Sequence, residues 1–290
     1  MDVKSDNTVA NSKNRVLARK YRPLNFKRLI GQQTLIRTLS GSIERNRLAH
    51  AYMLTGVRGV GKTTTARIIA KVFNCLNPEK IPEISINPCG KCECCLGIAS
   101  GNHIDVLEMD AASKTGVDDV RDLIEFSRYG PTSSKYKIFI IDEVHMLSKQ
   151  AFNALLKTLE EPPEYLKFIF ATTEIKKIPI TVVSRCQRFD LSRIKSSELL
   201  EYIKKIKDKE NGKITEDALK LIVKISEGSV RDALSLLDRA LLSLDDGKEL
   251  DLNSAQKIFG YFDKSQLIDL FELILKGEET KVISIYRKIY

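Results

Sequence analysis

The sequence predicts an α/β domain built on a parallel five-stranded sheet, followed by a purely helical bundle. Up to about residue 195, short β-rich apolar segments alternate with helical segments, which is typical of a parallel sheet with helical connections. From residue 196 onward only helical periodicity remains, in segments joined by short loops, and this indicates a small helix bundle.

Each predicted element comes from its own local pattern. Helical periodicity is clear in 63–73 and 118–128, and a third helix, from residue 149, ends at Pro162-Pro163 because proline cannot continue a helix. The predicted helices of the bundle span 196–210, 215–226, 229–244 and 252–262. The predicted strands are 51–54, 103–111, 136–143, 166–174 and 186–192.

Composition narrows the class of protein. A length of 290 residues suggests two domains and a partial third, and a hydrophobic fraction of 43% allows sizeable cores. The polar segment 1–15 lacks the apolar region of a secretory signal, so we expect a disordered leader and a cytoplasmic protein without membrane contact. A net charge of +9 fits either solvated lysines on helix faces or an acidic partner such as nucleic acid.

The segment after the first strand has the G-x-x-x-x-G-K-T pattern of a P-loop. Its glycines let backbone N–H groups surround phosphates, and the following helix N-terminus favours negative charge. Lys62 would reach the β- and γ-phosphates of ATP, and Thr63 would hold Mg²⁺. The predicted nucleotide-binding residues of the loop are Gly56, Val57, Arg58, Gly59, Val60, Gly61, Lys62, Thr63 and Thr64.

An acidic pair ends the predicted strand 136–143. Asp142 and Glu143 stand at its carboxyl end, the edge at which an open α/β sheet presents its ligand site. Asp142 would order Mg²⁺, and Glu143 would polarise the attacking water. A solvent-facing acidic pair is the alternative, and the neighbouring P-loop makes it the weaker one.

Five of the six cysteines lie between residues 75 and 95. A disulfide framework is disfavoured in a reducing cytosol. The spacing C-x₂-C-x₂-C, with a fourth thiol upstream, suits a tetrahedral structural Zn²⁺, while unpaired buried cysteines are the alternative. Cys94 is expected to point away from the metal, and Cys186 to be a small core residue. The predicted zinc ligands are Cys75, Cys89, Cys92 and Cys95.

A helix-capping pattern in the bundle points back to the nucleotide. Ser229-Val-Arg-Asp232 is a capping sequence that places Arg231 in the first turn of a helix. From there Arg231 can reach a phosphate bound by the neighbouring domain. Taken alone, a surface arginine in a salt bridge is the simpler explanation.

Several stretches together resemble a known family. They include "VLARKYRPLNFKRLIGQ", "NPCGKC", "IIDEVHMLSKQAFNALLKTLEEPPE", "TVVSRCQRF" and "EGSVRDALSLLDRA". With these motifs in order from Val16 to about Tyr261, the chain resembles the gamma/tau family of DNA polymerase III clamp-loader subunits, which are AAA+ ATPases. Among these motifs, the cysteine module best distinguishes this family from other P-loop ATPases. The resemblance implies an AAA+ domain at 16–195 with a zinc module at 75–95, a helical lid at 196–258, and the truncated start of a collar domain at 259–290.

The resemblance also implies roles for individual residues. Thr173 corresponds to the sensor of the γ-phosphate or water, and Arg185 to an arginine finger that acts in trans on a neighbouring subunit's ATP. Arg231 corresponds to the lid sensor. Further implied contacts are those of Tyr21, Arg22 and Pro23 with adenine, and those of Lys114 and Lys157 with the DNA backbone. Gly116 replaces a second basic residue that some family members carry.

The implied activity is an ATP-driven switch within the DNA polymerase III holoenzyme, a DNA-directed DNA polymerase. ATP binding would order a ring of delta, delta-prime and further gamma/tau subunits, which opens a sliding clamp on primed DNA, and hydrolysis would release it. Three alternatives are weaker. A branch-migration motor should lack the cysteine module, a helicase should carry a second core domain, and a non-catalytic scaffold should not retain Lys62, Glu143 and Arg185.

Overall fold

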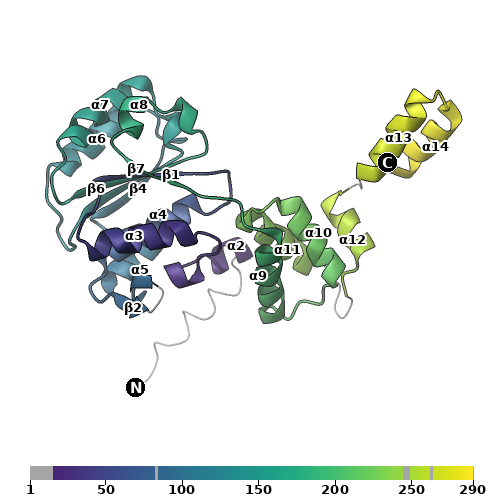
Figure 1. The fold of residues 1–290 in the computed structure, drawn as a ribbon, viewed down its shortest axis with the longest axis horizontal. Helices are drawn as coiled ribbons and strands as arrows, with labels where there is room; N and C mark the ends of the chain where they lie inside the picture. Colours follow the sequence, from purple (N-terminus) through teal and green to yellow (C-terminus); the bar gives the residue numbers. More distant parts are fainter. Residues whose placement is uncertain (1–15, 82–83, 244–248, 262–263, 290) are drawn as a thin grey trace, which may run out of the picture.

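The computed structural model describes residues 16–81, 84–243, 249–261 and 264–289, so the predicted leader 1–15 lies outside the described residues. Three parts follow one another along the chain and lie in a row in Figure 1. They are a sheet-containing domain, a helical bundle and a helical hairpin.

The central sheet has five parallel strands in the order β4-β5-β6-β1-β7. This confirms the predicted parallel five-stranded sheet. β1 is the fourth strand in this order, so the loop after β1 opens at the carboxyl edge of the sheet between β6 and β7. The strands are β1 (Ala51–Thr55), β4 (Val106–Asp110), β5 (Lys137–Asp142), β6 (Leu166–Thr172) and β7 (Gln187–Asp190).

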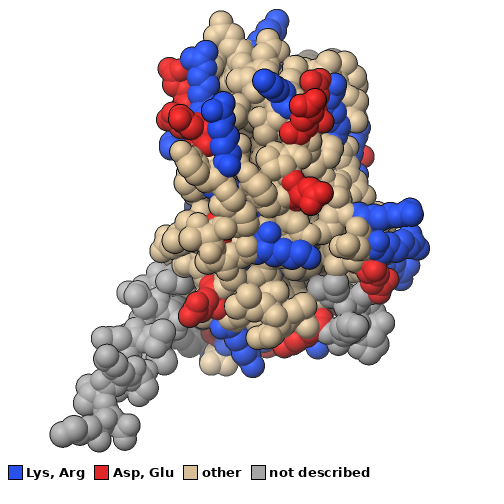
Figure 2. All heavy atoms as spheres, turned by 90° about the vertical axis from the view of Figure 1, so that its left-hand side faces the viewer, with Lys and Arg blue, Asp and Glu red and all other residues tan. Residues whose placement is uncertain are grey.

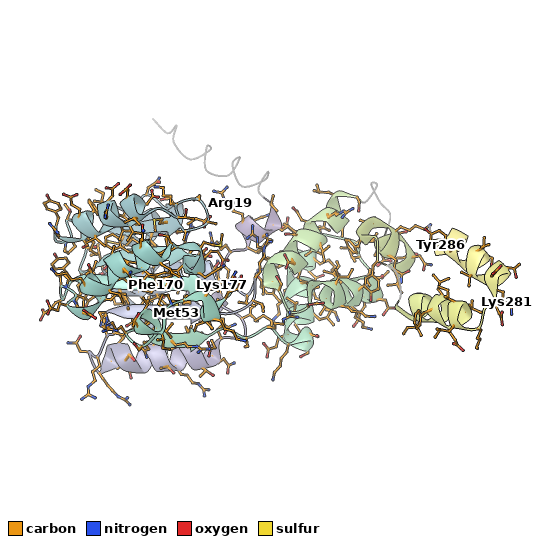
Figure 3. The ribbon with its side chains drawn as sticks, turned by 90° about the horizontal axis from the view of Figure 1, so that it is seen from above. Arg19, Met53, Phe170, Lys177, Lys281 and Tyr286 are labelled. Carbon is orange, nitrogen blue, oxygen red and sulfur yellow. The ribbon has the colours of Figure 1, made fainter. Side chains whose placement is uncertain are left out.

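Helices cover both faces of this sheet (Figure 1). One face packs on α3 (Gln33–Glu44) and α4 (Lys62–Asn74). The other packs on α6 (Val117–Ser127), α7 (Lys149–Glu160) and α8 (Ile180–Val183). All residues of β1 and β6 are buried, because successive side chains of a strand enter opposite cores. Met53 and Phe170 pair across these two strands and lie in one core (Figure 3).

Small elements complete the domain. The hairpin of β2 (Glu79–Ile81) and β3 (Ile84–Asn87) and the helix α5 (Glu93–Ser100) lie between α4 and β4. The sequence analysis had placed only a cysteine module here. Three short 3₁₀ turns are η1 (Phe26–Arg28), η2 (Val144–Met146) and η3 (Ile175–Lys177).

The predicted helical bundle consists of α9 (Ser196–Lys209), α10 (Glu216–Ser226), α11 (Val230–Leu242) and α12 (Leu252–Phe259). A helix from the other end of the chain joins it. Leu17 on α2 (Leu17–Lys20) is buried in the core of the bundle, together with Leu199, Ile222 and Leu237. The N-terminal helix therefore packs with the lid, although it precedes the sheet domain in sequence.

The last part is a hairpin of α13 (Lys264–Leu275) and α14 (Glu279–Ile289). Several of its apolar side chains are exposed, among them Ile268, Phe271, Leu275 and Tyr286. None of the helices in the described part of the chain combines the length and apolar character needed to cross a membrane.

Candidate nucleotide-binding site

The P-loop lies between β1 and α4, at the carboxyl edge of the sheet. Gly56, Gly59 and Gly61 have φ angles of 151°, 82° and 99°, which L-residues rarely adopt. Lys62 is only 6% exposed. Its Nζ donates to the carbonyl oxygens of Gly56 and Val57, at 3.0 and 3.2 Å. The loop thus surrounds a buried ammonium group, and its backbone fits a phosphate chain.

Electrostatics support this interpretation. Burial lowers the pKa of Lys62, while the nearby carboxylates of Glu143 and Asp142 act in the opposite direction. A buried cation is stabilised by a compensating anion. The triphosphate of a nucleotide would supply such an anion.

Thr63 and Asp142 meet in the structure. Thr63 is the second residue of α4, and Asp142 ends β5. The Thr63 Oγ1 donates to Asp142 Oδ2 at 2.5 Å, across 79 residues of sequence. A hydroxyl oxygen and a carboxylate oxygen at this distance are the ligand types that Mg²⁺ prefers. The two side chains predicted for magnesium are thus together.

Glu143 and Thr173, which the sequence analysis named separately, are also brought together. Glu143 has a left-handed backbone, with φ 46° and ψ 43°. The Thr173 hydroxyl, which follows β6, donates to Glu143 Oε2 at 3.1 Å. The carboxylate is therefore held at the boundary between two adjacent strands, beside the P-loop lysine.

Sequence reasoning missed one neighbour of this carboxylate. His145 Nδ1 lies 3.0 Å from Thr172 Oγ1 and 3.4 Å from Glu143 Oε2. The available signal was a histidine two residues after the Asp-Glu pair. Its partners were not predictable, because the pairing of β5 with β6 brings them together.

The lid contacts the P-loop directly. The backbone N–H of Arg231 points to the carbonyl oxygen of Gly59 at 3.5 Å. Ser229 Oγ accepts from the Asp232 N–H at 3.2 Å, which confirms the predicted N-cap of α11. The Arg231 side chain is exposed beside this contact. Its role as a lid sensor stays a prediction.

The segment expected at the adenine connects the lid to the P-loop helix. The Tyr21 hydroxyl donates to Glu210 at the end of α9, and Lys20 pairs with the same carboxylate at 2.7 Å. On the other side, Arg22 Nε donates to Thr64 Oγ1 at 3.0 Å. Burial and then the nearby Arg67 lower the pKa of Arg22. Arg22 thus contacts the P-loop itself, and Pro23 next to it is partly buried.

Arg185 follows α8 and has partners away from the P-loop. Its guanidinium donates to the Thr181 carbonyl oxygen and to Glu160 Oε1, both at 2.6 Å. Its side chain is 33% exposed. Its role as an arginine finger that acts on a neighbouring subunit stays a prediction.

The four predicted zinc ligands converge. The sulfur atoms of Cys75, Cys89, Cys92 and Cys95 all lie within 4.8 Å of one another. Backbone N–H groups point at three of these sulfurs, including that of Cys89 from Cys92 at 3.4 Å. Four thiols this close together are compatible with Zn²⁺, which prefers four sulfur or nitrogen ligands at structural sites. Cys94 and Cys186, which were not predicted to bind the metal, are outside the cluster.

One thiol of the cluster has a low pKa. Burial acts to raise the pKa of Cys89. The backbone N–H groups of Lys91 and Cys92 and the neighbouring thiols outweigh it and lower the pKa to about 7. Thiolates are the metal-binding form of cysteine. Burial raises the pKa of Cys75 and of Cys95, so the shift toward the thiolate concerns Cys89.

The two lysines proposed to face DNA, Lys114 and Lys157, are both exposed. On the end of the sheet domain drawn in Figure 2, basic and acidic side chains alternate with neutral ones. The net positive charge is thus not gathered into one continuous field on that face. DNA contact by these lysines stays a prediction.

Together, the parallel sheet, the P-loop, the acidic strand end and the contacting lid define a P-loop nucleotide-binding fold. A similar fold occurs in the RuvB Holliday junction branch migration motor of Thermotoga maritima, with a TM-score of 0.60 and 21% identity. The match covers 88% of this chain and 79% of that chain. At this identity, the likeness concerns the fold alone.

Three family models match successive parts of the chain. They are described as DNA polymerase III, delta subunit (residues 31–195), DNA polymerase III clamp loader subunit, ATPase lid domain (198–244), and DNA polymerase III subunits gamma and tau domain III (250–290). The third match begins at residue 250 and therefore includes α12, although Ala255 of this helix packs in the core of the lid.

Relatives agree with these matches. The DNA polymerase III subunit gamma of Buchnera aphidicola subsp. Schizaphis graminum is 42% identical over 94% of this chain and 74% of its own length. The subunit tau/gamma of Haemophilus influenzae is 42% identical over 90% of this chain. The chain belongs to the gamma/tau family of DNA polymerase III subunits. It spans 37% of the Haemophilus influenzae relative and 41% of the Escherichia coli one.

Proposed function

We propose that this chain is an ATPase motor of a bacterial clamp loader. It would couple ATP binding and hydrolysis to the opening of a sliding clamp and its loading onto primed DNA in the cytoplasm. The observation that carries the proposal is the cluster of candidate nucleotide-site side chains in a gamma/tau family member. Lys62, the Thr63–Asp142 pair and the Thr173–Glu143 pair lie around one P-loop.

Each side chain has a definite part in this chemistry. Lys62 would exchange its loop carbonyl partners for phosphate oxygens. Thr63 and Asp142 would hold Mg²⁺, which supplies charge neutralisation when it is bound. Glu143 would orient and polarise the attacking water, with Thr173 beside it. Arg22 donates a hydrogen bond to Thr64, so it would lie near the phosphates as well as near the adenine.

The proposal includes a neighbouring subunit. Arg185 lies away from its own P-loop, so it would complete the site of the next copy and stabilise transition-state charge there. The ring would contain further gamma/tau copies with delta and delta-prime subunits. Lys114 and Lys157 would contact the DNA backbone without reading its sequence.

We also propose that the cysteine cluster holds a structural Zn²⁺. All four thiols are within bonding reach of one ion, and no oxygen or nitrogen ligand is required. A closed set of four protein ligands leaves no position for a substrate. The metal would then brace the hairpin and α5 against α4 without taking part in hydrolysis.

The test uses the full-length protein assembled with its companion subunits. ATP hydrolysis is measured with and without sliding clamp and primed DNA. We expect stimulation that is lost in Arg185→Ala and retained in Arg37→Ala, an exposed arginine on α3. A wild-type rate that ignores clamp and primer would reject the clamp-loader proposal and favour another DNA-associated AAA+ ATPase. Loading without any hydrolysis would favour a scaffold.

A further inference from the structure

The carboxylate of Glu143 has one hydrogen-bond donor, Thr173, and one close imidazole neighbour, His145. Thr173 Oγ1 donates to Oε2 at 3.1 Å. His145 Nδ1, on the turn η2, lies 3.4 Å from the same oxygen. Oε1 has no hydrogen-bond partner among the residues that the structure describes. One oxygen is therefore held, and the other is available for a further hydrogen bond.

The imidazole of His145 is itself tightly placed. Its side chain is 6% exposed. Nδ1 lies 3.0 Å from Thr172 Oγ1, and that oxygen accepts from the Glu174 N–H at 3.0 Å. On the far side, Nε2 lies 3.6 Å from Glu174 Oε1, and the Glu174 carboxylate pairs with Lys177 at 2.9 Å. The ring is thus held between the two carboxylates.

Whether Nδ1 carries a hydrogen determines how the ring interacts with Thr172 and Glu143. Thr172 Oγ1 already accepts one bond, and its second lone pair can accept from Nδ1–H. Glu143 Oε2, which is an acceptor only, lies 3.4 Å from Nδ1 as a close contact and not as a second hydrogen bond. A hydrogen on Nδ1 therefore binds Thr172 and places a positive partial charge beside the carboxylate, whereas a bare Nδ1 lone pair would lie against the carboxylate oxygen.

We propose that His145 is a positioning residue for ATP hydrolysis, which holds the Glu143 carboxylate so that its free oxygen can orient the attacking water. This inference rests on the proposed ATPase function and deepens it. The Glu143 side chain is 31% exposed and its own backbone is left-handed, so without a second contact the side chain could rotate into solvent. A displacement of about 1 Å can cost on the order of 10²-fold in rate.

The alternative is that His145 only fills space beside β6. Substitutions whose side chains differ in length distinguish the positioning role from the space-filling role. In His145→Asn the amide nitrogen can replace Nδ1, and its two hydrogens can serve Thr172 and Glu143. In His145→Gln the amide nitrogen falls near Nε2, on the side of Glu174. His145→Ala removes both.

The experiment uses the full-length protein in its complex and measures unstimulated kcat and KM for ATP. We expect kcat to fall about 10–100-fold in His145→Ala and His145→Gln, with KM within about twofold, because a misplaced carboxylate affects the chemical step. His145→Asn should recover most of the lost rate. Unfolding temperatures and the affinity for a fluorescent ATP analogue show whether a variant has lost stability or nucleotide binding.

Three outcomes would overturn the inference. They are a wild-type kcat in His145→Ala, a kcat in His145→Asn as low as in His145→Gln, and a rise in KM that accounts for the whole effect. Clamp and primed DNA are then added to the wild-type complex. Absence of stimulation there would reject the clamp-loader proposal but leave the result on His145 intact, because that result comes from the unstimulated rate.

Discussion

Ser229 Oγ occupies space that a Cβ atom on Gly59 would need, since the ideal Cβ position lies 1.9 Å from it. The two residues are far apart in sequence, one in the P-loop and the other the N-cap of α11. The backbone bond from Arg231 to the Gly59 carbonyl lies beside them. The absence of a side chain at residue 59 thus lets the lid reach the P-loop.

We therefore expect Gly59→Ala to separate the lid from the P-loop. The φ of 82° adds strain of roughly 1–2 kcal/mol for any L-residue. ATP affinity should fall about tenfold, which titration of a fluorescent analogue would measure. Gly41→Ala is the matched control, because a Cβ there meets nothing within 4 Å. Unchanged ATP affinity in Gly59→Ala would show that the contact is dispensable.

Glu143→Gln should separate ATP binding from hydrolysis. The amide keeps the shape of the side chain but cannot polarise water as a base, so kcat should fall by about 10²–10⁴-fold. ATP affinity should stay within about threefold, because Lys62 and Thr63 are untouched. Single-turnover hydrolysis measures the effect, with Glu44→Gln, an exposed residue of α3, as control. A normal rate in Glu143→Gln would contradict the role of this carboxylate.

Metal analysis should find about one zinc ion per chain. Cys92→Ser should lose it, since one of four soft ligands is removed. Cys94→Ala should retain it, because the Cys94 sulfur is outside the cluster although Cys94 is the next cysteine after Cys92 along the chain. Chelation should lower the unfolding temperature of the wild type by at least about 5 °C. Equal zinc contents in the two variants would refute the assigned ligand set.

The Tyr21–Glu210 contact predicts an alkaline loss of stability. Burial, followed by the hydrogen bond and charge of Glu210, raises the pKa of Tyr21 to about 12. The folded state therefore favours the neutral phenol. Its contribution is complete below the ordinary tyrosine pKa of about 10 and is lost as the pH rises toward 12.

Tyr21→Phe should lower the free energy of unfolding by about 1 kcal/mol at pH 7, allowing for solvent screening of this partly exposed contact. The difference from wild type should shrink between pH 10 and pH 12. Urea unfolding at pH 8 and pH 11 measures it. Tyr129→Phe, at a residue that is 68% exposed, is the control and should change little. A pH-independent difference would mean that the phenol does not titrate through this contact.

Local patterns in the sequence were enough for the main elements. The five strands and the lid helices follow from hydrophobic periodicity and helix-breaking residues, which act over a few neighbours. The P-loop spacing likewise placed Lys62 and Thr63 correctly at the start of α4. The cysteine spacing identified four thiols that the structure brings within 4.8 Å of one another. Each of these signals is contained in a short stretch of chain.

The remaining relationships depend on which strands pair and on how the lid docks. Leu17 packs in the lid core, His145 meets Thr172 across β5 and β6, and Ser229 fills the space beside Gly59. A contact between distant segments depends on the packing of whole elements, and no local propensity specifies it. The sequence alone thus determined the elements, the fold class and the chemistry of the nucleotide site, while tertiary packing decided what orients that chemistry.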